Sequence, residues 1–226
     1  MKSEIYSQIV SNESLEAIIK GLNISKYDSV LAICGSGDQA IAIYEKAGKV
    51  TVIDNDESQL KCLLEKKGAI ELGRFDEFFN LNESCEYQQD FDVLFERNEY
   101  FSKRLNSIKR KLKEEDSFVT IIGNVFTFNF KKTMYNKIYL SNALSFDYLG
   151  QDYKIIQGRL KRLTQQLNKN GLIYISDGKN IMNTTDLEVN PIGLKVNHQL
   201  TVVAQKLQFK TKYWYDHWLP FVFEKI

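Results

Sequence analysis

Apolar residues recur along the chain with two different spacings, and the alternation between them predicts an α/β protein. Short, continuously apolar runs, such as residues 30–34, are typical of strands buried on both faces of a parallel sheet. Apolar residues three and four positions apart indicate amphipathic helices between these runs. The predicted strands are residues 29–34, 50–53, 117–123, 136–140, 171–176, 200–209 and 213–224. The predicted helices are residues 12–22 with Asn12 as cap, 38–46 and 153–167, together with a helical stretch from 57 to about 115.

The order of these elements predicts a doubly wound, mostly parallel sheet in one domain spanning residues 1–226. The strands on either side of the helix at 38–46 must be parallel, because a crossover of that length returns the chain in the same direction. The last two strands are expected to close the sheet as an antiparallel hairpin. Class I methyltransferase-like domains have this architecture. The helical insertion at 57–115 could form a lid or a wall of the substrate site.

Composition and charge exclude several classes of function. Thirty Lys and Arg residues against 29 Asp and Glu give a net charge of +1, so we expect no broad basic surface for nucleic acid. The amino terminus lacks the apolar core of a secretory signal, and no apolar run is long enough to span a membrane. Three scattered cysteines and two histidines predict neither a disulfide framework nor a metal centre. We therefore expect a cytoplasmic protein.

Two glycines stand where the first strand turns into its helix. Gly35 and Gly37 lack Cβ atoms, so the backbone can approach a ligand closely and adopt positive φ angles. The helix that begins near Asp38 directs its free N–H groups towards that ligand. Asp54 follows the second strand, where a carboxylate can accept hydrogen bonds from both ribose hydroxyls. The segment 27–56 therefore predicts a site for the adenosine end of a cofactor.

The glycine spacing alone leaves the cofactor open, since G-x-G-x-x-A is also compatible with NAD. Asp38 places a negative charge at the start of the helix, where a pyrophosphate would lie. S-adenosylmethionine carries no phosphate, and its sulfonium and amino groups tolerate a nearby carboxylate. This reasoning favours S-adenosylmethionine.

The sequence resembles the S-adenosylmethionine-dependent 3-amino-3-carboxypropyl transferases related to the diacylglycerol enzyme of betaine-lipid synthesis. The resemblance is strongest over the first 80 residues. Its segments are IYSQ (5–8), SLEAI (14–18), VLAICGSGDQAIAI (30–43), VTVIDNDESQLKCLLEKKGAI (50–70), FDEFF (75–79) and IYLSNALSFD (138–147). The resemblance implies transfer or cyclisation of the aminocarboxypropyl group of S-adenosylmethionine, with release of methylthioadenosine.

Resemblance and position together assign the cofactor contacts. The residues of the glycine turn bind the methionine part, those after the second strand bind the ribose, and two amino-terminal residues close over the cofactor. These residues are Gly35, Ser36, Gly37 and Asp38 for the methionine part, Asp54, Asn55 and Gln59 for the ribose, and Tyr6 and Gln8 for the closure. Asn124, after another strand, is either an adenine contact or a turn residue.

Candidates for the chemistry follow the strand at 136–140. Ser141 and Asn142 lie just past its carboxyl end, where open α/β sheets place ligand-binding groups, although Asn142 could equally cap a turn. Asp147 is a candidate general base, and Tyr148 is one of several tyrosines that could supply a hydroxyl. The cluster at 213–218 either lines an acceptor pocket, with His217 as a base, or forms an aromatic closing strand.

The acceptor stays open at this point. A small molecule, a lipid hydroxyl and the amino group of the donor itself are all compatible with the sequence. Three other functions also remain: a small-molecule methyltransferase on the same fold, a non-catalytic domain that binds S-adenosylmethionine, and an NAD oxidoreductase.

Overall fold

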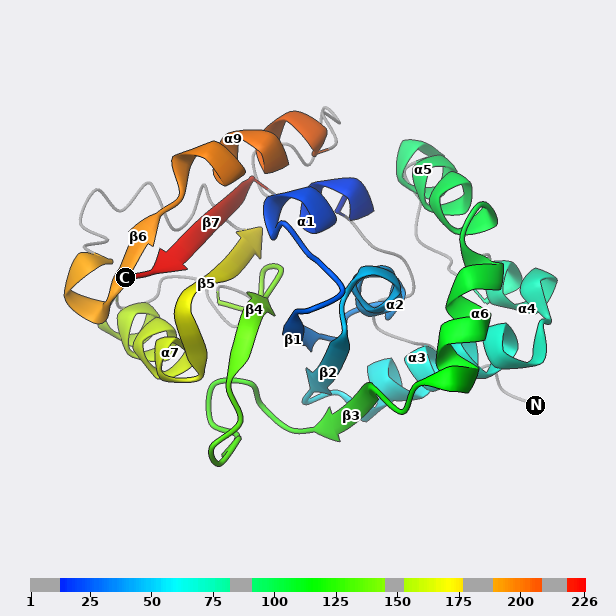
Figure 1. Cartoon of the computed structure of the whole chain (residues 1–226), viewed down its shortest axis with the longest axis horizontal. Coiled ribbons are helices and arrows are strands. Elements are labelled where there is room, and N and C mark those ends of the chain that lie inside the picture. Colours follow the sequence, from blue (N-terminus) through cyan, green and yellow to red (C-terminus); the bar gives the residue numbers. More distant parts are fainter. Residues whose placement is uncertain (1–12, 82–90, 145–152, 177–188, 209–218) are drawn as a thin grey trace.

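The computed structural model describes residues 13–81, 91–144, 153–176, 189–208 and 219–226, and within them a seven-stranded sheet forms the centre (Figure 1). The strands are β1 (Ser29–Ile33), β2 (Lys49–Asp54), β3 (Phe118–Ile122), β4 (Tyr135–Tyr139), β5 (Leu167–Ser176), β6 (Leu194–Val196) and β7 (Pro220–Lys225). The helices are α1 (Leu15–Gly21), α2 (Asp38–Lys46), α3 (Glu57–Leu72), α4 (Phe75–Asn80), α5 (Phe91–Ser102), α6 (Leu105–Glu114), α7 (Tyr153–Gln165) and α9 (His198–Leu207), with a 3₁₀ turn at Asn190–Ile192.

The sheet has the order β3-β2-β1-β4-β5-β7-β6, and the prediction of a mostly parallel, doubly wound sheet is confirmed. β1 pairs in parallel with both β2 and β4, while β7 runs antiparallel between β5 and β6. After β1 the chain moves outward to β2 and β3, and it then returns to the other side of β1 through β4. Such a switch point opens a crevice at the carboxyl ends of the strands, where this kind of sheet binds ligands.

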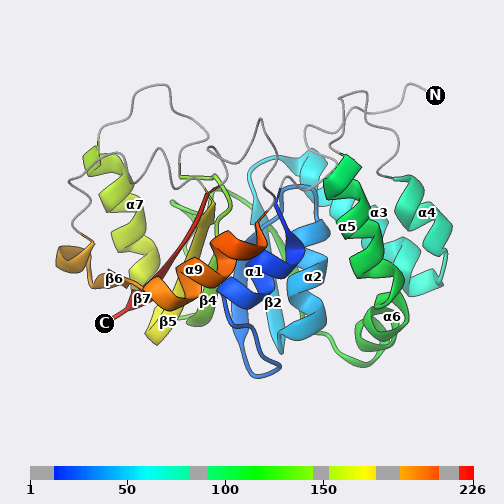
Figure 2. The ribbon, with the colours of Figure 1, turned by 90° about the horizontal axis from the view of Figure 1, so that it is seen from above.

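Helices cover both faces of the sheet. α1, α2 and α9 lie against one face and α7 lies against the other (Figures 1 and 2). Two clusters of buried residues match these layers, one beneath α1, α2 and α9 and one beneath α7. Within the described ranges, no helix is long and apolar enough to cross a lipid bilayer.

The first helix is shorter than predicted. It begins at Leu15, and its cap is Ser14, whose Oγ accepts a hydrogen bond from the backbone N–H of Ala17 at 3.2 Å. The predicted cap, Asn12, lies outside the described residues. Gly21 is the last residue of the helix, and a Cβ there would lie 2.9 Å from the Cβ of Ala204 in α9. The glycine therefore also allows close packing of α1 against α9.

The prediction of a strand at 200–209 is wrong, because these residues belong largely to α9. Asn197 caps this helix by accepting a hydrogen bond from the backbone N–H of Leu200 at 3.1 Å. Thr201 and Ala204 are buried against the neighbouring elements, which is the spacing of a helix and not of a strand. The sheet does end in an antiparallel pair, β6 and β7, but a helix connects the two strands in place of a hairpin turn.

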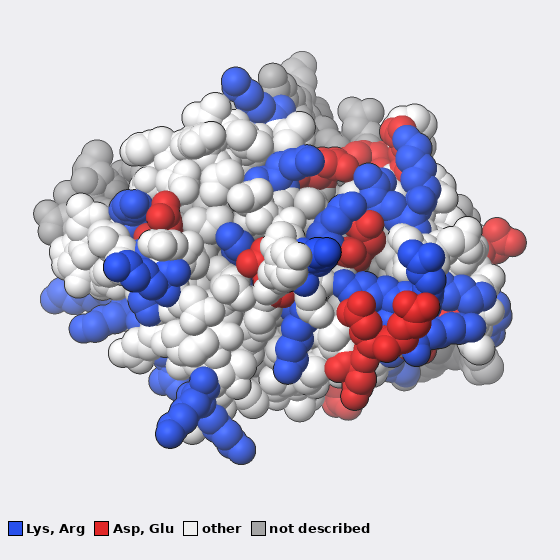
Figure 3. Space-filling model, in the orientation of Figure 1, with Lys and Arg blue, Asp and Glu red and all other residues white. Residues whose placement is uncertain are grey.

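The insertion is helical as predicted, and its described part comprises α3 to α6. Figure 1 shows α4, α5 and α6 together at one end of the molecule, beyond α2 and α3. The surface at this end carries acidic and basic side chains side by side (Figure 3). Lys111 of α6 donates a hydrogen bond to the carbonyl oxygen of Tyr44 in α2 at 2.8 Å, and this bond connects the two helices.

Candidate cofactor site

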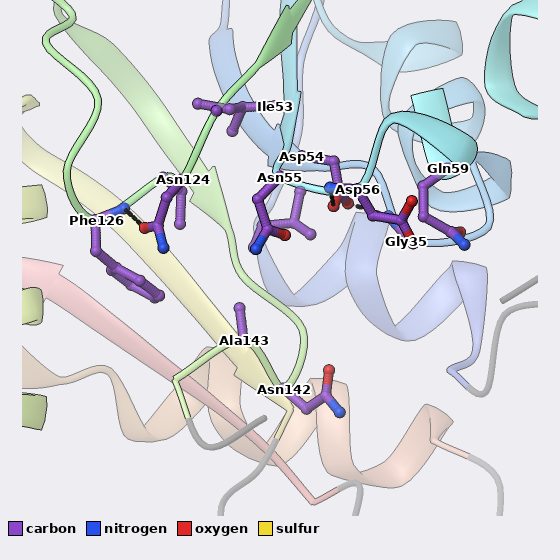
Figure 4. Close-up of a pocket in the computed structure, with 13 residues that line it drawn as sticks. Gly35, Ile53, Asp54, Asn55, Asp56, Gln59, Asn124, Phe126, Asn142 and Ala143 are labelled. Carbon is purple, nitrogen blue, oxygen red and sulfur yellow. Dashed lines mark hydrogen bonds between the residues drawn. The ribbon is translucent and has the colours of Figure 1, made fainter. Parts of the chain in front are cut away.

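A cleft lies at the carboxyl ends of β1, β2, β3 and β4, on both sides of the switch point. Its volume of about 140 Å³ is roughly ten times the space that one water molecule needs, so it can hold part of an organic ligand. Figure 4 shows Asp54, Asn55 and Asp56 on one side, Asn124 and Phe126 on the opposite side, and Asn142 below them. The described lining consists of Ile33, Gly35, Ile53, Asp54, Asn55, Asp56, Gln59, Gly123, Asn124, Val125, Phe126, Asn142 and Ala143.

The turn between β1 and α2 requires both of its glycines. Gly35 has a φ of 51° and Gly37 a φ of 83°, values in the left-handed region that favours glycine. A Cβ on Gly37 would also lie 3.1 Å from the Cα of Leu63 in α3. Gly35 lines the cleft, whereas Gly37 lies behind it as the N-cap of α2.

Asp54 ends β2 and lines the cleft. Its Oδ2 accepts a hydrogen bond from the backbone N–H of Gly35 at 3.2 Å, and its Oδ1 accepts one from the N–H of Asp56 at 3.0 Å. Burial raises the pKa of Asp54 above its ordinary value of 3.8, although these backbone hydrogen bonds partly offset the effect. The two bonds fix the orientation of the carboxyl group at the mouth of the glycine turn.

Asn124 combines the two roles that the sequence left open. Its Oδ1 accepts a hydrogen bond from the backbone N–H of Phe126 at 2.8 Å, so it is a turn residue. It also lines the cleft, next to the ring of Phe126 (Figure 4). Because Oδ1 is bonded to the turn, the NH₂ group is the part of this amide that can donate to a ligand.

Other predicted site residues fall in three places. Asn55, Gln59 and Asn142 line the cleft together with Gly35, Asp54 and Asn124. Ser36, Gly37, Asp38 and Ser141 are described but do not line it. Tyr6, Gln8, Asp147, Tyr148 and the cluster at 213–218 lie outside the described residues.

Asp38 is fully buried and forms ion pairs behind the turn. Its Oδ2 lies 2.7 Å from Nε of Arg97, and its Oδ1 lies 3.0 Å from Nζ of Lys66. Burial by itself would raise the pKa of Asp38, but the two cations reverse this and hold it below the ordinary value of 3.8. The charge of Asp38 is therefore balanced within the protein, and it gives no reason to disfavour a pyrophosphate in the cleft.

Arg97 is a residue that the sequence analysis did not identify. It is buried on α5, 59 positions from its partner Asp38, and its Nη2 also donates to Asp38 Oδ1 at 3.2 Å. Three aromatic rings surround the guanidinium, with centroids 4.9 Å (Phe78), 5.9 Å (Phe79) and 5.5 Å (Phe101) from its central carbon. The FDEFF segment thus packs around the arginine that holds Asp38, while Gln59 is the one described lining residue contributed by the insertion.

The cleft has a distinct electrostatic character. Among the described residues that line it, none is a lysine or an arginine, whereas two are aspartates and four carry side-chain amides. In the described part of the chain, no three His, Cys, Asp or Glu side chains gather to form a metal-binding group. The lining is suited to hydroxyl, amino and heterocyclic groups, since these donate to carboxylates and pair with amides.

Comparisons with known proteins agree with this geometry at the level of the fold. No protein-family model matches the sequence, and no curated protein sequence matches it. Solved structures do match nearly the whole chain. The CcbJ methyltransferase from Streptomyces caelestis is 12% identical with a TM-score of 0.54, and the match covers 94% of this chain and 95% of that one.

Two further structures show the same likeness. The N-methyltransferase NodS from Bradyrhizobium japonicum WM9, in complex with S-adenosyl-L-homocysteine, is 11% identical with a TM-score of 0.51, over 92% of this chain and 83% of that one. The [4+2]-cyclase SpnF is 8% identical with a TM-score of 0.50, over 93% and 79% of the two chains. At these identities the likeness concerns architecture alone. The chain therefore has the class I methyltransferase-like fold.

Proposed function

We propose that the cleft binds S-adenosylmethionine and that the protein is a transferase dependent on this cofactor. The observation that carries the proposal is the Asp54 carboxyl group, held by the N–H groups of Gly35 and Asp56 at the end of β2. In this position it can accept hydrogen bonds from both ribose hydroxyls. Asn124 and Phe126, across the cleft, offer an amide donor and an aromatic wall to the adenine.

The absence of lysine and arginine from the described lining favours a cofactor without phosphate. A pyrophosphate needs cations or several convergent N–H donors. Lys66 and Arg97, behind the glycine turn, are bonded to Asp38, and the N–H groups of Gly35 and Asp38 donate to side chains of the protein. S-adenosylmethionine brings a sulfonium and an amino group, which the acidic lining accepts. This argument from the lining of the cleft replaces the argument from the negative charge of Asp38 at the start of the helix.

For the transferred group, the sequence resemblance supports the aminocarboxypropyl group, with methylthioadenosine as the other product. The acceptor attacks the γ-carbon of the methionine part, and the carbon–sulfur bond breaks with its electrons going to sulfur. Such in-line displacements need orientation of the two reactants more than a covalent nucleophile. Asn142, on the cleft wall after β4, is the described residue best placed to orient the acceptor.

Methyl transfer is the second candidate. The named structural neighbours include the CcbJ methyltransferase and the N-methyltransferase NodS, which was solved with S-adenosyl-L-homocysteine. The fold is therefore compatible with presenting either carbon of the sulfonium to the acceptor.

Product analysis separates the candidates. The protein is incubated with S-adenosylmethionine, alone and with simple amine and hydroxyl acceptors, and the nucleoside product is identified by mass spectrometry. Methylthioadenosine above the level in protein-free and Asp54→Ala controls supports aminocarboxypropyl transfer. S-adenosylhomocysteine would assign methyl transfer instead, and binding without turnover would favour the non-catalytic alternative. Absence of binding would overturn the cofactor proposal itself.

A further inference from the structure

A fully buried glutamate lies near the cleft, at a position that the sequence did not single out. Glu13 directly precedes Ser14, the N-cap of α1, and is 1% exposed. Its Oε2 accepts a hydrogen bond from the Tyr139 hydroxyl at 2.6 Å and another from Oγ of Ser141. Tyr139 ends β4, and Ser141 follows it by two residues. The glutamate therefore connects the first helix to the carboxyl end of a central strand.

Further polar groups surround Glu13. The Tyr174 hydroxyl of β5 is fully buried, and the buried Ser176 side chain at the end of the same strand faces both this hydroxyl and Glu13. On the other side, Ser14 donates to the carboxyl group of Glu96 in α5 at 2.9 Å. Two carboxyl groups thus gather beside the buried Tyr174 hydroxyl.

Ser141 lies between this buried cluster and Asn142, and it does not itself line the cleft. Its φ of 50° is left-handed and therefore unfavourable for serine, and the next residue, Asn142, lines the cleft. Ser141 is partly exposed, whereas Glu13 is buried. Because the hydroxyl gives its only proton to Glu13, its oxygen can act only as an acceptor towards a ligand. A group bound there must be a hydrogen-bond donor, and the carboxylate behind Ser141 favours one with positive charge.

The sheet order indicates which end of the cofactor reaches Ser141. The lining residues suited to adenosine follow β2 and β3, whereas β1 and β4 lie next along the sheet. An extended ligand whose ribose is at Asp54 therefore passes Gly35 and reaches the end of β4, about 10 Å away at two strand spacings. Its methionine part, which carries an ammonium group, would end near Ser141.

We propose that Ser141, with Glu13 behind it, binds the α-amino group of the methionine part of S-adenosylmethionine. This assignment rests on the function proposed above. Ser141 is the contacting group, and Glu13 acts through it as a positioning residue that makes the hydroxyl a charge-assisted acceptor. The subsite would hold the amino group whichever carbon of the sulfonium reacts.

The test compares two nucleosides by isothermal titration calorimetry with the full chain. S-adenosylhomocysteine carries the amino-acid part, and methylthioadenosine lacks it, while both share the adenosine and the thioether. Glu13→Gln and Ser141→Ala should each lower the affinity for S-adenosylhomocysteine by about 10- to 100-fold, the range for the loss of a hydrogen bond to a charged group. Neither should change the affinity for methylthioadenosine. Glu16→Gln, a substitution on the partly exposed side of α1, is the matched control and should change neither affinity.

The outcomes separate this inference from the function on which it rests. If the wild-type protein binds neither nucleoside, the proposed cofactor is wrong. If it binds both and the two variants leave S-adenosylhomocysteine unchanged, the subsite is refuted while the cofactor stands. Equal weakening of both nucleosides would also refute it, since Glu13 would then only support the fold. Should Glu13→Gln not fold, as judged by circular dichroism, Ser141→Ala decides the matter.

Discussion

The buried ion pairs of Asp38 allow a quantitative prediction about stability. Arg97 lies 2.7 and 3.2 Å from the two carboxylate oxygens and is enclosed by three aromatic rings. Replacing it by methionine keeps much of the apolar contact but leaves a buried carboxylate with one cation fewer. Removing one partner of a buried pair costs about 3–5 kcal/mol. We place Arg97→Met near the lower end of that range, because Lys66 still lies 3.0 Å from Asp38.

Such a loss is easily measured. A domain is typically stable by about 5–15 kcal/mol, and 3 kcal/mol lowers the melting temperature of a chain of this size by about 6–12 °C. Urea denaturation followed by circular dichroism at pH 7 gives the free energy of unfolding directly. The pKa of Asp38 in the folded protein lies below its ordinary value of 3.8. Its contribution to the free energy of unfolding is therefore complete above pH 3.8, and it is lost only as the pH falls through the pKa of the folded state.

Two further variants test the cause. Asp38→Asn leaves both Lys66 and Arg97 without their carboxylate, so it should be at least as destabilising as Arg97→Met. The double variant Asp38→Asn/Arg97→Met should lose at least about 1 kcal/mol less than the sum of the single losses, because the groups interact directly. Arg104→Met is the control. Its partly exposed ion pair with Glu16, at 3.5 Å, should be worth about 0–1 kcal/mol. An Arg97→Met loss below about 1 kcal/mol, or strict additivity, would refute the reasoning.

Three shorter predictions concern the cleft and its supports. Asp54→Ala should weaken S-adenosylhomocysteine and methylthioadenosine equally, by at least about 10-fold in calorimetry, and unchanged affinities would remove the ribose assignment. Gly37→Ala should cost about 1–3 kcal/mol in urea unfolding, since its φ is 83° and Leu63 lies 3.1 Å from the added Cβ. Gly68→Ala, in α3 with no atom within 4 Å of a new Cβ, should instead gain about 0.5–1 kcal/mol, and equal effects would contradict the conformational argument. Burial raises the pKa of Glu13 above 4.5, so lowering the pH should reduce the preference for S-adenosylhomocysteine over methylthioadenosine in the wild type but not in Glu13→Gln.

The pH comparison isolates Glu13 from its neighbours. Tyr139 and Tyr174 face the same cluster, but burial raises their pKa values well above 10.0, so they stay neutral in the acidic range. Burial also raises the pKa of Glu96, which is present in both proteins and cancels in the comparison. A preference that falls equally in wild type and Glu13→Gln would assign the titration to another group.

The parts of the structure that sequence reasoning anticipated are those with local causes. β1, the glycine turn, α2 and Asp54 follow one another within 26 residues, and each is specified by its own spacing and residue types. The error at 200–209 arose because Thr201-Val202-Val203 has strand propensity, whereas packing of the segment against α1 favours a helix. That packing depends on Gly21, about 180 positions away, and no local pattern contains it.

Arg97 and Glu13 cannot be identified from local sequence patterns, because their roles depend on long-range contacts. Arg97 is 59 positions from Asp38, and Glu13 is 128 positions from Ser141. Taken alone, Arg97 is one of many charged residues on a helix, and Glu13 resembles an ordinary acid beside a helix cap. The helical periodicity of α5 and the capping residue Ser14 indicate where Arg97 and Glu13 lie in local structure. Neither feature indicates that Arg97 contacts Asp38 or that Glu13 contacts Ser141. The sequence places Asp38 at the start of a helix, next to the expected ligand. In the structure its charge instead forms buried ion pairs with Lys66 and Arg97.

The two missed residues are connected through α5, which has a consequence for the insertion. Glu96 accepts a hydrogen bond from Ser14, next to Glu13, and its neighbour Arg97 binds Asp38, next to the glycine turn. A single turn of α5 therefore contacts the supports on both sides of the proposed methionine subsite. The described part of the insertion contributes only Gln59 to the lining of the cleft, and α5 contacts the residues behind that lining. If the methionine part binds between Gly35 and Ser141 as proposed, α5 supports both sides of its subsite, through Ser14 beside Glu13 and through Asp38 beside the glycine turn.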